Sequence, residues 1–262
     1  MRTTVTKFLT PLLFVLMSCG GDDPSQDSPV PEPEDQHCLL QKQITPSLTS
    51  TVTRDDAGLP TIINYDYKVG ATEFKTAANM EYDASGKLTK IQGQDYSFTF
   101  EYDSEGKITV EKYQATFDPQ KIYTYPYERS FLYNDEGQLI RITTNANNYE
   151  RYEYDAEGNL SKKFLKTTTQ AEYLTTEYIT YDDKKSPYPE FPFQVNIYLG
   201  MSEVSALITS LRPVVPENNV LTVKSYSPDG TFTMQNTTYT YNDSGYPTSI
   251  QELNLSNIFE CD

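Results

Sequence analysis

A seven-residue turn pattern recurs along the chain and restricts its fold more than any other feature. Each clear copy begins with Tyr-Asp or Tyr-Asn, has Gly four residues after the tyrosine, and most return to Leu or Ile two residues later. These copies span residues 82–88, 102–108, 133–139, 154–160 and 241–247, with weaker echoes at 55–59 and 226–230. Asp or Asn favours a type I turn, and glycine readily adopts the left-handed conformation that follows. The pattern therefore predicts a series of β-hairpins.

The segments between these turns have the alternation of half-buried strands. In residues 73–82 the even positions carry Phe, Thr, Ala, Met and Tyr, while the odd positions are mostly charged or amide residues. We expect about fourteen strands in an all-β antiparallel meander, curled into a barrel or partial barrel. With 22 Tyr, 12 Phe and no Trp, aromatic rings are expected to fill it. The glycines assigned to the turns are Gly58, Gly86, Gly106, Gly137, Gly158, Gly230 and Gly245.

Residues 182–219 interrupt the repeats. A Pro-rich stretch, 186–193, is followed by a spacing that predicts one short helix. Its apolar positions are Val204, Leu207, Ile208 and Leu211, with Ser202 as a possible N-cap and Pro213 just past the end. Two roles are open for this helix: a plug in one mouth of the barrel, or a lid over a binding cavity.

The N-terminus predicts export and lipidation. Residues 1–18 combine Arg2 and Lys7 with a short apolar stretch, as a secretory signal does. Leu16-Met17-Ser18-Cys19-Gly20 resembles a bacterial lipobox, which implies cleavage before Cys19 and lipidation of its thiol. The acidic residues that follow resemble the export signal of Bacteroidota-type surface lipoproteins. We therefore expect a lipid-anchored outer-membrane protein that faces the cell exterior; an inward-facing lipoprotein with an acidic linker is the alternative.

Residues 19–37 are predicted to form an acidic, Pro-rich tether that ends at His37, the chain's single histidine. Residues 38–262 are then one β domain. With Cys19 consumed by lipid, Cys38 and Cys261 are left at the two ends of this domain. A meander that curls toward closure brings its first and last strands together, so we predict a Cys38–Cys261 disulfide, against the alternative of two free buried thiols.

The turn repeats resemble the YD repeats of the Rhs family. The architecture over roughly residues 45–255 is similar to that of a lipoprotein domain family of unknown function with a porin-like fold. Its most specific parts are the YD turns and the segments 180–187, 218–220 and 245–248. The resemblance implies a fold and a surface address, without an assigned reaction. The copies are too few and too unevenly spaced for the toxin-enclosing shell of large Rhs proteins.

Composition excludes most catalytic and metal chemistry. A net charge of −16 argues against nucleic acid binding, and one histidine is too few for the usual zinc sites or Ser-His pairs. No phosphate-binding glycine motif occurs, so no cofactor is expected. A carboxylate-pair glycoside hydrolase is the residual catalytic alternative. Asp55-Asp56 and Asp182-Asp183 are possible calcium ligands, but their spacing does not match a calcium loop, and no metal site is predicted.

Two functions are left. The first is a monomeric, non-catalytic interaction or scaffold module at the cell surface, with an unknown extracellular partner. The alternative is a lipoprotein that captures a glycan, peptide or apolar molecule in an aromatic-lined barrel. A transmembrane porin is a third reading, against which the lipobox, the charged outward faces and the Glu260-Cys261-Asp262 terminus argue. The volume inside the barrel separates the first two, because a barrel filled with rings has no room for ligand.

Overall fold

The structure is a computed structural model that describes residues 37–115, 127–188, 192–199, 205–212 and 214–261. These residues all belong to one compact unit, Asp35–Asp262. The predicted signal, the predicted lipidation site Cys19 and most of the predicted tether lie outside the described residues, while His37 is exposed directly before the first strand. No helix in the described ranges has the length and apolar character needed to span a membrane.

The described chain forms nineteen strands and one 3₁₀ turn, Gln251–Leu253. The first twelve strands are Cys38–Ile44 (β1), Leu48–Arg54 (β2), Pro60–Val69 (β3), Thr72–Tyr82 (β4), Leu88–Gln92 (β5), Tyr96–Tyr102 (β6), Ile108–Ala115 (β7), Tyr127–Tyr133 (β8), Leu139–Asn145 (β9), Asn148–Tyr154 (β10), Leu160–Lys166 (β11) and Tyr173–Lys185 (β12). The others are Phe193–Leu199 (β13), Ser205–Leu211 (β14), Asn218–Tyr226 (β15), Phe232–Asn236 (β16), Tyr239–Tyr241 (β17), Pro247–Ile250 (β18) and Leu255–Cys261 (β19).

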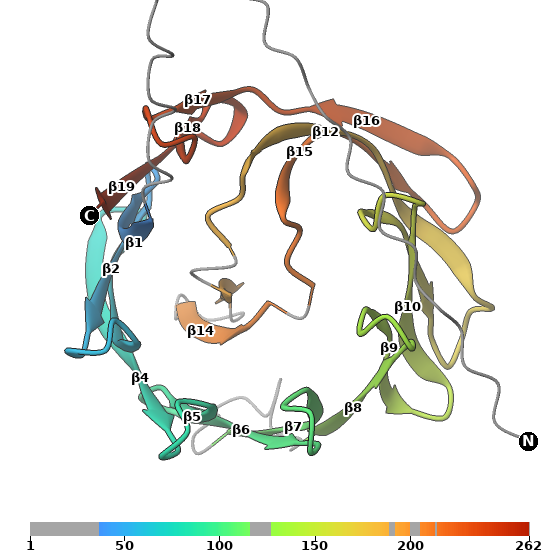
Figure 1. Cartoon of the computed structure of the whole chain (residues 1–262), viewed down its shortest axis with the longest axis horizontal. Coiled ribbons are helices and arrows are strands. Elements are labelled where there is room, and N and C mark those ends of the chain that lie inside the picture. The colour runs from blue at the N-terminus through green and yellow to red at the C-terminus, as the bar shows by residue number, and fades with distance from the viewer. Residues whose placement is uncertain (1–36, 116–126, 189–191, 200–204, 213, 262) are drawn as a thin grey trace, which may run out of the picture. The chain divides into compact units, whose positions relative to one another are not determined.

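Seventeen of these strands form one antiparallel sheet that curls round on itself (Figure 1). The hydrogen-bonded order runs from β17 through β18 and β19 to β1, then in sequence from β2 to β12, and finally to β15 and β16. The predicted antiparallel meander is confirmed, with more strands than the repeat count suggested. The sheet does not close, because no ladder joins its end strands β16 and β17 within the described chain.

The predicted disulfide is present. Cys38 and Cys261 face each other in the β1–β19 ladder, and their sulfur atoms are bonded with the Cα atoms 4.1 Å apart. The first and last strands of the domain are therefore neighbours, as expected. They are not the edges of the sheet, however, since β1 also pairs with β2 and β19 with β18.

The helix expected in residues 182–219 is wrong. Residues 205–211 form strand β14, which pairs with β13 in a separate hairpin that lies inside the curled sheet (Figure 1). Ser202, Val204 and Pro213 lie outside the described residues. The same stretch also has a period of two: Leu207, Thr209 and Leu211 lie opposite the alternating apolar residues Ile197, Val195 and Phe193. Pairing with this partner strand outweighs the helical spacing.

The hairpin packs against one part of the inner wall. Phe193 is buried in a large core cluster with inward side chains of β1–β7, and Leu211 packs on the same cluster. A second, smaller cluster forms around Leu139, Ile142, Tyr152 and Leu160 on strands β9–β11. The two clusters show that the inside of the sheet is filled unevenly.

The seven turns of the repeat have the same backbone geometry. At Asp83, for example, the main-chain N–H donates to Lys87 O, and the carboxylate accepts the N–H groups of Ser85 and Lys87. The seven turn glycines predicted from the sequence have φ between +79° and +88°, a range that favours glycine.

In four of the five clear repeats, the tyrosine hydroxyl donates to a main-chain carbonyl earlier in the chain, whereas Tyr241 of the fifth donates to Asp182. The hydroxyl of Tyr102 donates to the Leu88 carbonyl at 2.6 Å, and Tyr154 donates to Leu139 at 2.8 Å. Equivalent bonds, from hydroxyl to carbonyl, are Tyr82 to Pro60, Tyr133 to Ile108, Tyr181 to Leu160 and Tyr239 to Val220. The ladder between β5 and β6 begins only at Lys90, so Tyr102 supplies a donor where strand pairing has ended.

Candidate functional site

A cavity of about 320 Å³ lies between the inner wall and the segment that enters the sheet after β12. Its surface combines tyrosine rings with one arginine, and we call it the Tyr–Arg cavity. The polar and aromatic lining residues are Tyr152, Tyr178, Tyr181, Tyr188, Tyr239, Lys163, Arg212, Ser186, Asn218 and Asn219; the apolar ones are Leu160, Val214, Pro216 and Val220.

Two parts of the chain build this cavity. Tyr152 on β10 and Tyr178 on β12 come from the wall, where strand alternation turns them to the same face as Lys163 on β11. Tyr188 and Arg212 come from the inserted segment, before and after the β13–β14 hairpin. The insertion that interrupts the repeats thus supplies one side of the cavity.

Arg212 is held by two contacts. Its guanidinium carbon lies 3.7 Å from the centre of the Tyr188 ring, and its main-chain N–H donates to Pro192 O at 2.6 Å. The Nε atom of Arg212 is buried and has no hydrogen-bond partner among the described residues. The side chain is thus positioned by stacking, with hydrogen-bonding capacity left over.

Three of the five tyrosine hydroxyls are already engaged. Tyr181 and Tyr239 donate to strand carbonyls, as described above, and Tyr152 donates to the Glu150 carboxylate. Burial, reinforced by the charge of Glu150, raises the pKa of Tyr152 far above its ordinary value. Within the described chain, the hydroxyls of Tyr178 and Tyr188 show no hydrogen bond. These two are therefore the phenol donors available to a ligand.

Charges in and beside the cavity are unevenly paired. Lys163 forms an ion pair with Glu150 at 3.0 Å. Burial raises the pKa of Tyr178, with a further rise from the charge of Glu150 and an opposing effect from the charge of Arg212. Tyr178 and Arg212 both line the cavity. Arg212 itself has no carboxylate partner among the residues described.

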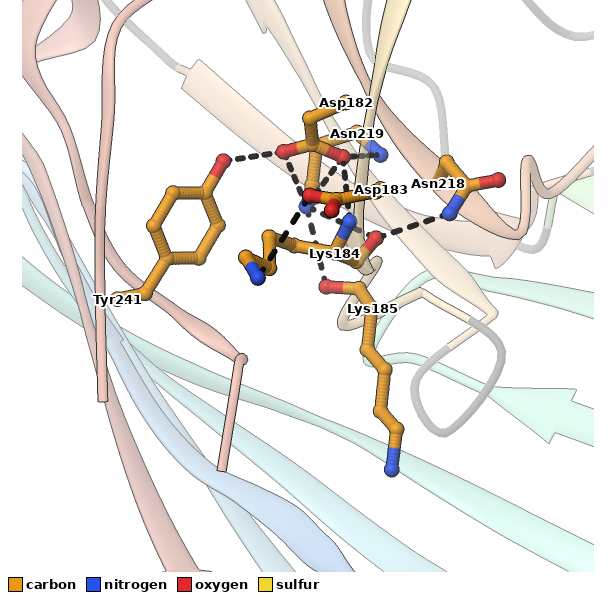
Figure 2. A network of polar contacts seen from close by, with 7 residues as sticks. All are labelled: Asp182, Asp183, Lys184, Lys185, Asn218, Asn219 and Tyr241. Atoms are coloured by element: carbon orange, nitrogen blue, oxygen red, sulfur yellow. Dashed lines mark hydrogen bonds and ion pairs between the residues drawn. The ribbon is translucent and has the colours of Figure 1, made fainter. Parts of the chain in front are cut away.

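A polar network fixes the point where the insertion leaves the wall (Figure 2). Asp182 at the end of β12 accepts the main-chain N–H of Asn219 at 3.0 Å and its side-chain amide at 3.2 Å. The Tyr241 hydroxyl also donates to Asp182, and Asn219 donates to the Lys185 carbonyl at 3.1 Å. The pKa of Tyr241 is raised, first by burial and then by this bond to Asp182. The network ties β12, β15 and β17 together on one side of the Tyr–Arg cavity.

The acidic pairs considered as calcium ligands have structural contacts. Asp182 holds the network just described, and Asp55 accepts the N–H groups of Ala57 and Leu59 inside its turn. Among the described residues, no group of three or more His, Cys, Asp or Glu is arranged to hold a metal ion.

A second cavity, of about 360 Å³, adjoins the first at the edge formed by the turns. Leu160, Val214 and Pro216 line both cavities. Its other walls include the turns at Gly137 and Gly158. The two cavities thus share part of their wall, and both lie against the inserted segment.

The sequence located the insertion but did not single out the side chains that line the cavity. Arg212 stood beyond the end of the expected helix, and Tyr188 was part of a Pro-rich stretch without further assignment. A usable signal was present: Arg212 is the only arginine in residues 182–219. Of the residues singled out from the sequence, Cys38 and Cys261 are brought together, and the turn glycines lie at separate turns.

Comparisons with known proteins agree with the fold. Residues 133–171 match the model of the RHS repeat, in the region of the turns at Gly137 and Gly158. A porin-like protein from Bacteroides uniformis ATCC 8492 is similar in structure, with a TM-score of 0.53 and 15% identity over 85% of this chain and 95% of that one. The likeness confirms the porin-like fold expected from the sequence.

More distant similarities involve much longer chains. The TcdB2-TccC3 structure gives a TM-score of 0.32 at 14% identity, over 80% of this chain and 12% of the other. A Photorhabdus luminescens Tc holotoxin pore gives 0.30 at 14% identity, over 81% and 14%. The search of curated proteins returns no significant match.

Proposed function

We propose that this chain is a non-catalytic surface lipoprotein that binds a small ligand in the Tyr–Arg cavity. One observation carries the proposal: the inside of the curled sheet is packed beside β1–β7, whereas beside β9–β12 a smaller core cluster leaves a cavity. A volume of about 320 Å³ lies within the range of small-molecule sites, which are largely preformed, mostly apolar and contain a few placed polar groups. Tyrosine rings offer both a flat apolar face and a polar tip.

The address rests on the sequence. The signal at residues 1–18, the lipobox at Cys19 and the acidic residues after it favour a lipid anchor and exposure at the cell exterior. We expect Cys19→Ser to release a soluble protein with an unchanged circular dichroism spectrum. Protease treatment of intact cells should remove the wild-type domain. Membrane retention of the variant at wild-type levels contradicts the anchor, and protection of the wild type contradicts the outward orientation.

Binding is tested by screening the full chain against a library of phenols, sugars and organic acids by thermal shift. A ligand of the folded state at one hundred times its Kd stabilises by about 2.7 kcal/mol, which is readily measured as a rise in Tm. Val214→Trp fills the cavity from the inserted segment and should abolish these shifts. Ile179→Trp, at a 42% exposed position on β12, is the matched control and should leave them intact. The absence of any hit that Val214→Trp removes would contradict the proposal.

A second function, an interaction module, is favoured by the edge strand β16. All five of its residues are exposed, among them Phe232 at 53% and Met234 at 55%, and its outer edge has no ladder with any described strand. An unpaired edge of this kind can add a strand from another chain. A photo-crosslinking residue at Thr233 should then capture a partner on living cells, while the same residue at Ser85, in an exposed turn, should not. Equal capture at both positions, or none at Thr233, contradicts this second function.

A further inference from the structure

The Tyr–Arg cavity contains a cationic donor set, which indicates the chemistry of its ligand. We propose that the cavity recognises a small cyclic carboxylate, whose anionic group is held by the guanidinium of Arg212 with the hydroxyls of Tyr178 and Tyr188. This inference rests on the proposed binding function and specifies its ligand class.

Of the described cations in the cavity, one has no acid as a partner. Lys163 and Arg212 are the two cations that line the cavity, and Lys163 is neutralised by Glu150. Arg212 has a buried Nε without an acceptor and, among the described residues, no ion pair. A buried donor left without an acceptor destabilises a protein, and a charged one does so more strongly. An anionic ligand supplies the missing acceptor.

Another stacked arginine in the same sheet differs from Arg212 in its surroundings. Arg141 on β9 also has a buried Nε without a partner and is also stacked, with its guanidinium carbon 3.7 Å from the centre of the Tyr149 ring. It has a carboxylate nearby, however. The pKa of Glu172 is lowered mainly by its hydrogen bond from Arg151, and the charge of Arg141 contributes. Arg129 and Arg151 also lie over aromatic rings, and they form ion pairs with Glu111 and Glu172. Arg212 is the exception within the described chain.

The side chain of Arg212 is held in position before any ligand binds. The guanidinium presents a planar fork of donors that matches a carboxylate, and stacking on Tyr188 fixes the plane of that fork. Leu211, next to Arg212, packs against the large core cluster, which anchors the backbone. Because the side chain is ordered before binding, little conformational entropy is lost when the ligand arrives.

The rest of the cavity indicates the shape of the ligand beyond its carboxylate. Beyond the arginine, tyrosine rings and the apolar side chains of Leu160, Val214 and Val220 form much of the cavity wall, and the polar residues Ser186, Asn218 and Asn219 add to it. These surfaces suit a flat or cyclic group more than a short polar ion. A ring that carries one carboxylate satisfies both parts of the cavity.

The test measures affinities of the full chain by calorimetry for two matched pairs, benzoate with benzamide and glucuronate with glucose. We expect at least one acid to bind more tightly than its neutral counterpart. Arg212→Gln should weaken that acid at least about tenfold, since a charge-assisted hydrogen bond contributes about 1.5–3 kcal/mol. Arg212→Lys, which retains the charge without the fork, should weaken it less. Arg141→Gln is the matched control and should leave the affinity unchanged.

Tyr178→Phe and Tyr188→Phe give a second measure in case the Arg212 variants do not fold, because each removes a single hydroxyl. Both should weaken the acid and not the neutral compound. Equal binding of acid and neutral compound, or a loss in Arg141→Gln as large as in Arg212→Gln, overturns the carboxylate assignment. So does failure of both acids to bind. Library ligands that Val214→Trp displaces would still support the cavity in each of these cases, so the two proposals fail separately.

Discussion

Removing the Tyr102 hydroxyl tests how the repeats are joined. Tyr102 ends β6, and its hydroxyl donates to the Leu88 carbonyl at 2.6 Å. Leu88 is only 7% exposed and lies outside the β5–β6 ladder. In Tyr102→Phe the ring and its contact with Lys87, whose Nζ lies 5.5 Å from the ring centre, are retained. The carbonyl loses this donor. A buried polar group without its partner costs about 1–3 kcal/mol, so the free energy of unfolding should fall by that amount.

The assay is urea unfolding followed by circular dichroism, in which the midpoint should fall while the slope m stays constant. Tyr226→Phe is the control. The hydroxyl of Tyr226 donates to Glu177 at 2.8 Å at a half-buried position, where water can replace it, so its removal should cost less than removal of the Tyr102 hydroxyl. The reasoning is refuted if Tyr102→Phe is neutral, or if Tyr226→Phe costs as much.

Three further predictions follow from the same features. Burial raises the pKa of the four tyrosines that end β4, β6, β8 and β10 to about 12. The stability that comes from their neutral form is complete below pH 10 and is lost as the pH rises through 12, so absorbance at 295 nm should show that they ionise late, together with unfolding. Ionisation of every tyrosine near pH 10 in the folded protein would contradict this. Gly106→Val, at φ +86° with Lys87 Cε 3.3 Å from the added carbon, should cost at least about 1 kcal/mol, whereas Glu105→Ala in the same turn should be nearly neutral; the reverse order in urea unfolding would refute the turn assignment. Replacing Cys38 and Cys261 with serine should lower stability by up to about 5 kcal/mol in the chain-entropy model for a separation of 223 residues, yet leave the folded spectrum unchanged at 25 °C; an unchanged urea midpoint would contradict the entropic argument.

The repeated turns could be predicted because their information is local. Asp83 and Gly86 specify a turn through their own side chain and backbone preferences, and neighbouring copies repeat the same chemistry. The meander and the pairing of Cys38 with Cys261 follow from joining such hairpins in order. Even the bonds between repeats are implicit in the fixed position of the tyrosine.

The candidate site could not be predicted in the same way because it depends on tertiary contacts. Residues 205–211 fit a helix and a strand equally well by period, and only the partner strand β13 decides between them. Arg212 gains its meaning from Tyr188, Tyr178 and the absence of a nearby carboxylate in the described fold. None of these relations is visible in the spacing of residues along the chain.

The place where the sheet is left open has a topological consequence. Its two edge strands, β16 and β17, are consecutive in sequence and joined by Thr237 and Thr238, while the cysteine-linked strands β1 and β19 lie side by side within the sheet. The covalent chain thus forms a closed ring. The disulfide closes it between β1 and β19, which are paired, and the main chain alone connects β16 and β17, which are not. New chain ends between Thr237 and Thr238, with residues 38 and 261 joined by a short peptide, would interrupt no ladder of the sheet. The order of strands in the sheet is therefore a circular permutation of their order in the sequence. The natural chain ends lie where strands pair and a disulfide joins them, whereas the open edges of the sheet lie at Thr237 and Thr238.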